Sequence, residues 1–165
     1  MPKAKHNHLR PLSSVPIQAY FDNRLQLIDV IDAVLDEIGP ASLLISTYST
    51  SEAFLRRLLR LKNHGRIVSC SLFCDFKASR KTVLLDNLMQ AVCDAVFLCQ
   101  NHSKVVLLRN DSCCVAIVTS QNQTQGNRTE CGIITTDTLI ITQIEDGFTR
   151  LTDNSLQVRR MGAGS

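Results

Sequence analysis

Apolar positions in the first part of the chain follow the period of an α-helix in three segments. Aliphatic residues recur there at intervals of three and four, which predicts helices over residues 22–38, 52–62 and 82–92. Asp22 or Asn23 is placed to cap the first helix, and Gly39 follows its last turn. Ser49 and Glu52 have the spacing of a capping box at the start of the second helix.

Shorter apolar runs alternate with these segments and dominate the rest of the chain. They predict strands over residues 42–46, 66–73, 95–99, 103–109, 113–119 and 131–135. The tight turn Asn110-Asp111 joins two of them as a hairpin, and Asp137 can cap a final helix that carries Ile141, Ile144, Phe148 and Leu151. Strands and helices that alternate and then lead into a hairpin predict an α/β fold, a mixed β-sheet flanked by helices.

The two ends of the chain differ from its middle. Residues 1–16 are polar, basic and interrupted by prolines, so we interpret them as a flexible arm; residues 17–155 form the folded domain and residues 156–165 a C-terminal tail. A chain of 165 residues has the size of one domain. His6 and His8 have no cysteine or carboxylate beside them, which favours a solvated arm over a metal site.

The composition is that of an ordinary globular protein. Hydrophobic residues make up 44% of the chain and charged residues 20%. The longest apolar runs, such as residues 91–99, are short and contain a charge, which excludes a membrane span. The formal net charge of +3 is compatible with a polyanionic partner. The basic stretch from Arg56 to Arg66 is either a solvated helix face or a surface that follows phosphates.

Seven cysteines are spread through the chain without a C-x-x-C pair. No secretory signal precedes them, and most lie in apolar runs, where a free cysteine behaves as a small hydrophobic residue. We therefore interpret them as buried thiols of a cytoplasmic protein, and we expect no metal site.

The residues that can carry chemistry lie between His102 and Glu130. His102 and Lys104 are two positions apart on a predicted strand, so both side chains face the same way. Ser120 and Asn122 repeat this spacing at the end of the adjoining hairpin arm, and the turn should bring Asn122 near Lys104. The Gly-containing loop that returns to the sheet adds Asn127 and Arg128.

These side chains suit an attack on a phosphodiester. A neutral imidazole can form a covalent phosphohistidine, and Lys104 and Asn122 can donate to the phosphate oxygens. Glu130 can hold the other nitrogen of an imidazole. The leaving alkoxide needs a proton from a second histidine, but His64 lies beside a predicted helix end and is a poor candidate. A two-fold axis through the site would bring in the partner's His102.

Taken in order, the motifs resemble those of the phospholipase D superfamily. His102-Ser103-Lys104 is similar to its H-x-K, and Ser120-Gln121-Asn122 is similar to its downstream G-S-x-N. Glu130 stands where the family has a late acidic residue. The upstream order of strand, helix and strand agrees as well, so the resemblance extends over most of the chain.

The resemblance implies a phospholipase D-like single domain with metal-independent phosphodiesterase chemistry and no cofactor. His102 would be nucleophile or acid, Lys104 and Asn122 would bind phosphate, and Glu130 would orient the opposite histidine. The residues expected to contact the substrate are Ser120, Asn127 and Arg128. The single H-x-K is similar to that of the superfamily's short bacterial nucleases and type II-like endonucleases, which dimerise to assemble one site. The variant T-S-x-N with G-N-R-x-E resembles short phospholipase D-like proteins of phage or mobile-element type.

Two positions depart from the family pattern. Arg109 stands where the family has an aspartate that supports the site, and Thr119 replaces the glycine of G-S-x-N. A second hypothesis therefore stays open, a catalytically inactive module that binds nucleic acid or serves assembly. The alternative for His102 and Lys104 is a pair of solvated rim residues, and for Glu130 it is a surface ion pair with Arg128.

The sequence thus predicts a nuclease-like homodimer that acts on nucleic acid, with DNA favoured over RNA. A phospholipid substrate is disfavoured, because no membrane-binding helix or hydrophobic loop is visible. The chain has two Tyr, six Phe and no Trp, which disfavours a base-stacking platform.

Overall fold

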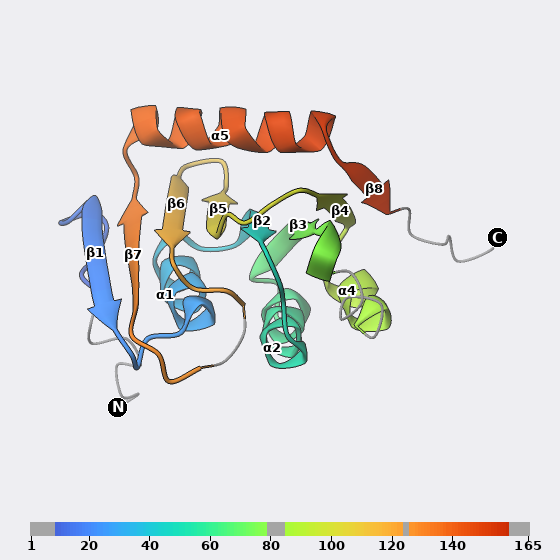
Figure 1. The fold of residues 1–165 in the computed structure, drawn as a ribbon. Coiled ribbons are helices and arrows are strands. Elements are labelled where there is room, and N and C mark those ends of the chain that lie inside the picture. The colour runs from blue at the N-terminus through green and yellow to red at the C-terminus, as the bar shows by residue number, and fades with distance from the viewer. Residues whose placement is uncertain (1–8, 79–84, 124–125, 159–165) are drawn as a thin grey trace.

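The computed structural model describes residues 9–78, 85–123 and 126–158, which form one mixed sheet with helices on both faces (Figure 1). The strands are β1 (Ile17–Asp22), β2 (Ala41–Thr47), β3 (Ile67–Asp75), β4 (Ala95–Cys99), β5 (Val105–Arg109), β6 (Cys114–Thr119), β7 (Glu130–Thr135) and β8 (Leu156–Val158). The helices are α1 (Leu27–Ile38), α2 (Glu52–Asn63), the 3-10 turn η1 (Phe76–Ala78), α4 (Asp86–Val92) and α5 (Thr138–Asp153).

The sheet has the strand order β1-β7-β6-β5-β2-β3-β4-β8. Its middle strands β2, β3 and β4 are parallel, whereas β5, β6, β7 and β1 continue it as antiparallel neighbours. Ser46 pairs with Val105, so the loop before β5 lies at the carboxyl ends of β2 and β3. The predicted α/β fold, a mixed sheet flanked by helices, is confirmed.

Helices cover the two faces of the sheet unequally. Helices α1, α2 and α4 pack on one face and bury Ile31, Leu58 and Met89, each at most 2% exposed. Helix α5 crosses the other face, as Figure 1 shows, and places Phe148 with its ring 5.4 Å from that of Phe73. Because α5 is a single helix, part of that face over β1, β7 and β6 remains open.

The first helix begins later than the sequence predicts, and the second begins at Glu52 as predicted but with a different cap. Helix α1 starts at Leu27, with Gln26 before it donating its backbone N–H to Asp29 over 3.3 Å. Asp22, one of the two predicted caps, instead ends β1 and accepts a hydrogen bond from the Arg24 backbone.

In α2 the N-cap is Ser51, whose hydroxyl accepts from the Phe54 N–H. The predicted capping box of Ser49 and Glu52 is wrong, since Glu52 pairs with Arg56 one turn further on. Part of the predicted third helix, residues 82–84, lies outside the described residues, and α4 is described from Asp86.

Both predicted tails contribute to the folded domain. Within the predicted arm, Leu12 is 7% exposed in the main core, and the Ser13 N–H donates to the Glu37 carboxylate. Within the predicted C-terminal tail, β8 pairs with β4 at the edge of the sheet. Leu12, Ser13 and β8 thus contact the core or the sheet from outside residues 17–155, and the predicted domain bounds stay a prediction.

Most cysteines are buried, as the sequence predicts. Cys70, Cys74, Cys93 and Cys99 lie in the core as free thiols. Burial raises the pKa of the Cys74 thiol to about 12, so it stays protonated at neutral pH. Cys131 differs, because it lies exposed on the open face of β7.

A close packing of Tyr20 on Gly132 gives a testable prediction about stability. The two residues are cross-strand partners, and a Cβ atom at position 132 would lie 2.6 Å from the Tyr20 ring. Gly132→Ala must displace this buried ring, so we expect a loss of about 1–3 kcal/mol in the free energy of unfolding in urea. Gly147→Ala is the control, since the nearest atom to a Cβ there is a guanidinium nitrogen of Arg150 at 4.0 Å, an ordinary contact, and a helix favours alanine. Equal stabilities of the two variants would contradict this packing.

Candidate active site

His102 and Lys104 contact each other at the carboxyl ends of the parallel strands, in the loop before β5 rather than on the strand over 103–109 that the sequence predicted. The Lys104 ammonium lies 3.2 Å from Nδ1 of His102 and donates to the His102 carbonyl over 2.9 Å. The imidazole is exposed, and its Nε2 has no hydrogen-bond partner among the described residues. The ring of Tyr48, from the end of β2, lies against it with the centroids 5.2 Å apart. The pair therefore offers a nitrogen and a cation to an incoming ligand.

A buried amide that the sequence reading missed holds the loop of His102. Asn101 is 7% exposed and donates from its side chain to the Ser46 hydroxyl over 2.7 Å. Its side-chain oxygen accepts from both the backbone and the hydroxyl of Ser103. The loop is thereby fixed to the ends of β2 and β3 on either side of His102. The signal in the sequence was a polar residue two positions after the apolar strand 95–99.

Asp75 is a second residue that sequence reasoning missed. It ends β3, is 8% exposed, and accepts the backbone N–H of Asn101 over 2.8 Å. This hydrogen bond, together with that from the Lys77 backbone and the nearby charges of Lys77 and His102, lowers the pKa of Asp75 below its usual value. An ionised carboxylate therefore lies near the imidazole of His102 at neutral pH, bonded to the residue before it.

Removing the charge of Asp75 should loosen the His102 loop. In Asp75→Asn the amide has one acceptor fewer for the N–H groups of Asn101 and Lys77, and we expect kcat to fall between about tenfold and a hundredfold. The lowered pKa means that Asp75 stabilises the fold above the usual pKa of an aspartate, and that this contribution is lost as the pH falls through its own pKa. Urea unfolding from pH 2 to pH 7 should therefore be less pH-dependent in Asp75→Asn than in the wild type. An unchanged pH dependence would show that the carboxylate is not held in this way.

Ser120 and Glu130 form a second pair on the neighbouring strands. The hairpin brings β6 back to β5, and the Thr119 N–H donates to the Lys104 carbonyl over 3.1 Å. The Ser120 hydroxyl donates to the Glu130 carboxylate and accepts from the Cys131 N–H. Glu130 thus binds Ser120, and the alternative ion pair with Arg128 does not occur. Ser120 directly follows Thr119, which is bonded to Lys104, so the pair lies at the same edge of the sheet as Lys104.

Thr119, which replaces the family's glycine, points into the fold. Its hydroxyl lies 2.7 Å from the Tyr20 hydroxyl and donates to the Cys131 carbonyl over 3.0 Å. Burial is the main cause that raises the pKa of Tyr20, so its phenol is neutral and serves the packing. The extra side chain at position 119 is therefore bonded to Tyr20 and to the Cys131 carbonyl, and it lies inside the fold.

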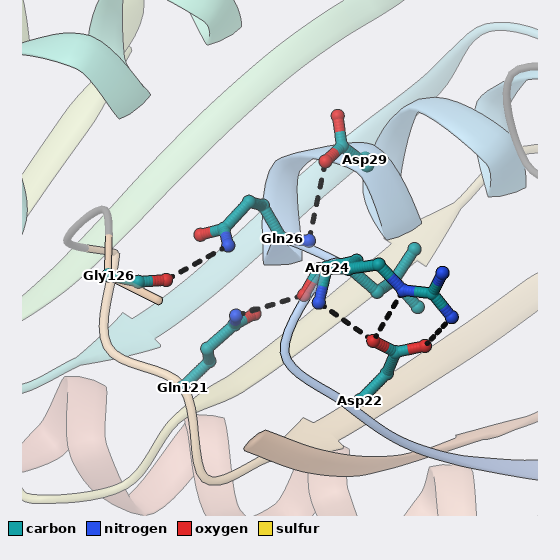
Figure 2. Close-up of polar contacts among 7 residues, drawn as sticks. Asp22, Arg24, Gln26, Asp29, Gln121 and Gly126 are labelled. Carbon is teal, nitrogen blue, oxygen red and sulfur yellow. Dashed lines mark hydrogen bonds and ion pairs between the residues drawn. The ribbon is translucent and has the colours of Figure 1, made fainter. Parts of the chain in front are cut away.

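Asn122 is not joined to Lys104 by any hydrogen bond within the described part of the chain. Its side-chain oxygen is buried without a partner and lines a small pocket with Gln26, Ser51 and Arg57. Figure 2 shows why the segment turns this way: Gln121 donates to the Leu25 carbonyl over 3.0 Å, and Gln26 donates to the Gly126 carbonyl over 3.2 Å. The start of α1 thus fixes this loop.

Asn127 and Arg128 lie exposed in the loop just before β7. They follow Gly126, the residue that Gln26 holds, and lead directly to Glu130 of the second pair. Their side chains form no hydrogen bond or ion pair with the described residues. Their predicted contact with a substrate stays a prediction.

The basic stretch on α2 is largely neutralised. Arg56, Arg57, Lys62 and Arg66 pair with Glu52, Asp29, Asp94 and two aspartates of α1, respectively. This agrees with a solvated helix face. Arg109 likewise binds Glu145 on α5, at the end of β5 opposite to Lys104.

No metal centre accompanies the site in the described ranges. Within residues 9–78, 85–123 and 126–158, no three His, Cys, Asp or Glu side chains are grouped to hold an ion. No helix among them is long and apolar enough to cross a bilayer.

Comparison with known proteins places the fold. No protein-family model and no curated protein sequence matches the chain. Among solved structures, it is similar to Nuc from Salmonella typhimurium, a phospholipase D family member, with a TM-score of 0.68 and 14% identity over 87% of this chain and 98% of that one. It is similar to NucT from Helicobacter pylori, with a TM-score of 0.65 and 16% identity over 86% and 98%. The chain has the phospholipase D fold.

A third similar structure extends this comparison. TrmBL2, an archaeal chromatin protein with a novel mode of DNA binding, matches with a TM-score of 0.56 and 8% identity over 92% of this chain and 57% of that one. The chain spans nearly the whole of Nuc and NucT but about half of TrmBL2. The resemblance seen in the motifs is thus confirmed at the level of the fold.

Proposed function

We propose that the chain is a metal-independent phosphodiesterase that cleaves nucleic acid, with DNA preferred over RNA. The observation that carries this proposal is the contact of 3.2 Å between Lys104 and His102, on a loop pinned by the buried Asn101. The side-chain pair Ser120–Glu130 at the same edge and the phospholipase D fold support it.

The reaction proceeds through a covalent phosphohistidine. The free Nε2 of His102 attacks phosphorus, a P–N bond forms, and the P–O bond to the leaving nucleoside breaks. Lys104 stabilises the charge on the phosphate oxygens. The leaving alkoxide takes a proton from His102 of the partner subunit, which then acts as the base for the attack of water. That attack breaks the P–N bond and restores both imidazoles.

An open apolar face beside the site supports the homodimer. Phe21 is 79% exposed on β1, Ile133 48% on β7 and Val118 42% on β6. Val118 and Ile133 are cross-strand partners, so they share one face, and β6 runs from Val118 directly to Ser120. A second copy that covers this face would bring its own His102 to the same edge. Glu130 is then available to orient the opposite imidazole.

The test is cleavage of labelled single- and double-stranded DNA and RNA in excess EDTA, followed by acid-labile labelling of the protein. We expect cleavage without metal and a phosphoprotein trapped on His102. His64→Asn is the matched control, because His64 is exposed at the end of α2. Cleavage that EDTA abolishes would contradict the proposal.

One observation favours a second function, an inactive module that binds nucleic acid. Asn122, a predicted phosphate ligand, lines a pocket with α1 and α2 residues rather than bonding to Lys104. Retained binding without cleavage of any of the four substrates would establish this function instead.

A further inference from the structure

A groove opens between α5 and the loop of His102, on the side of the site away from α2. We call it the α5 groove; it measures about 580 Å³, and its lining includes His102, Val105, Ile144, Gly147, Arg150 and Leu151. This volume lies within the range of small-molecule sites, about 300–1,000 Å³. Because His102 forms part of its wall, a group attached to a phosphate at His102 can extend into it.

The floor of the α5 groove is apolar, and its rim is polar. Val105, Ile144 and Leu151 are partly buried against the core beneath α5. Gln100 and Asn154 add amide groups at the rim. An apolar floor with a few polar groups suits a flat heterocycle whose edges carry donors and acceptors.

A glycine keeps the groove open. Gly147 lies in the interior of α5, where glycine is unfavourable for a helix. A Cβ atom at this position would meet nothing within 4 Å except one guanidinium nitrogen of Arg150, at 4.0 Å. Packing against the protein therefore does not require glycine here, and any side chain would project into the groove.

Positive charge is available at the wall of the α5 groove. Arg150 is exposed and forms no ion pair with the described residues, whereas Arg109 on the neighbouring strand is bound to Glu145. His102 with Lys104 and Arg150 thus bracket an apolar floor. This order of charges is complementary to a phosphate, a nucleoside and a second phosphate.

We propose that the α5 groove binds the nucleoside that stays attached to the scissile phosphate, and that Arg150 contacts the next phosphate of the strand. This inference rests on the proposed function, and it adds the path that the nucleic-acid strand takes across the protein. The proposal also explains why α5 has a glycine at position 147, because the missing side chain leaves room for the nucleoside.

The test compares two esters that share the same leaving group. Thymidine 5′-(p-nitrophenyl phosphate) places a nucleoside in the groove, whereas methyl p-nitrophenyl phosphate cannot. In Gly147→Leu we expect kcat/KM for the thymidine ester to fall at least about tenfold, and that for the methyl ester to change less than about twofold. Gly147→Ala is the matched control and should leave both values close to wild type.

Three results would overturn this proposal. The first is no change in either ester with Gly147→Leu, and the second is an equal fall in both. The third is a change from dimer to monomer in sedimentation, which would make the groove a subunit contact.

A binding measurement separates this proposal from the proposed function. If the wild type hydrolyses neither ester, fluorescence anisotropy with fluorescein-labelled (dT)12 still reports on the groove. Arg150→Gln should reduce the slope of log Kd against log salt by about 0.7, the value for one phosphate contact on a single strand. Arg60→Gln removes an exposed arginine of α2 and should leave the slope unchanged. An unchanged slope in Arg150→Gln, or an equal change in Arg60→Gln, would overturn the assignment.

Discussion

Replacing His102 with asparagine should abolish cleavage, lowering kcat by at least about three orders of magnitude. Asparagine can neither form a P–N bond nor deliver a proton to the leaving alkoxide. In a homodimer the substitution removes both imidazoles at once. The fold should be unaffected, because the ring is exposed and, among the described residues, its polar and aromatic contacts are those with Lys104 and Tyr48. We expect the free energy of unfolding to change by less than about 0.5 kcal/mol.

Mixed dimers show whether one site needs both subunits. Dimers of one wild-type and one His102→Asn subunit, purified through two different tags, should be as inactive as the homodimeric variant. Half of the wild-type activity would mean instead that each subunit carries a complete site. The first result would support the shared site, and the second would limit the proposal to chemistry within one chain.

The sequence predicted the sheet well where apolar runs are short and bounded by turn residues. The hairpin of β5 and β6 turns at Asn110, whose side-chain oxygen accepts from the backbone of Ser112 and Cys113 as its turn chemistry predicts. Asp137 caps α5 as expected. Strand β1 was missed, because its apolar and polar residues do not alternate in the sequence: Tyr20 faces the core while Phe21, equally apolar and next to it, is the most exposed aromatic ring described.

The sequence predicted the site only in part, because spacing fixes neighbours along a strand but not contacts between loops. The predicted contact between His102 and Lys104 needs only their separation of two residues, and the structure brings these side chains together. Asn122 was placed by the same rule, but the strand ends at Thr119, and the chain then follows Gln121 to the start of α1. Asp75 could not be found by spacing, because it reaches His102 through Asn101, from a strand that is distant in sequence.

Arg109 illustrates a departure that the fold accommodates. The residue lies at the far end of β5 from Lys104, where its guanidinium binds Glu145. Since the two positions are five residues apart along the chain, about 17 Å at 3.3 Å per residue, Arg109 cannot contact a phosphate at His102. The arginine at this position therefore affects the contact between β5 and α5. The residues around Lys104 carry the chemistry of the site.

Replacing Lys104 with methionine should separate phosphate stabilisation from the folding of the loop. Methionine keeps the length of the side chain but loses the ammonium that contacts Nδ1 and the carbonyl of His102. Removing one donor to the phosphate oxygens costs a factor of about 10²–10³ in kcat. Arg60→Met is the control, since Arg60 is an exposed cation on α2, away from the His102 loop.

The size and the kind of the loss in Lys104→Met identify its role. Binding of (dT)12 should weaken, and its salt slope should fall, because a cation at the phosphate has gone. Lys104→Arg should recover part of both the binding and the rate, which a lysine that only braced the His102 carbonyl would not explain. Cleavage within about threefold of wild type in Lys104→Met would show that the phosphate is held elsewhere, since methionine offers neither a charge nor a hydrogen-bond donor to developing negative charge.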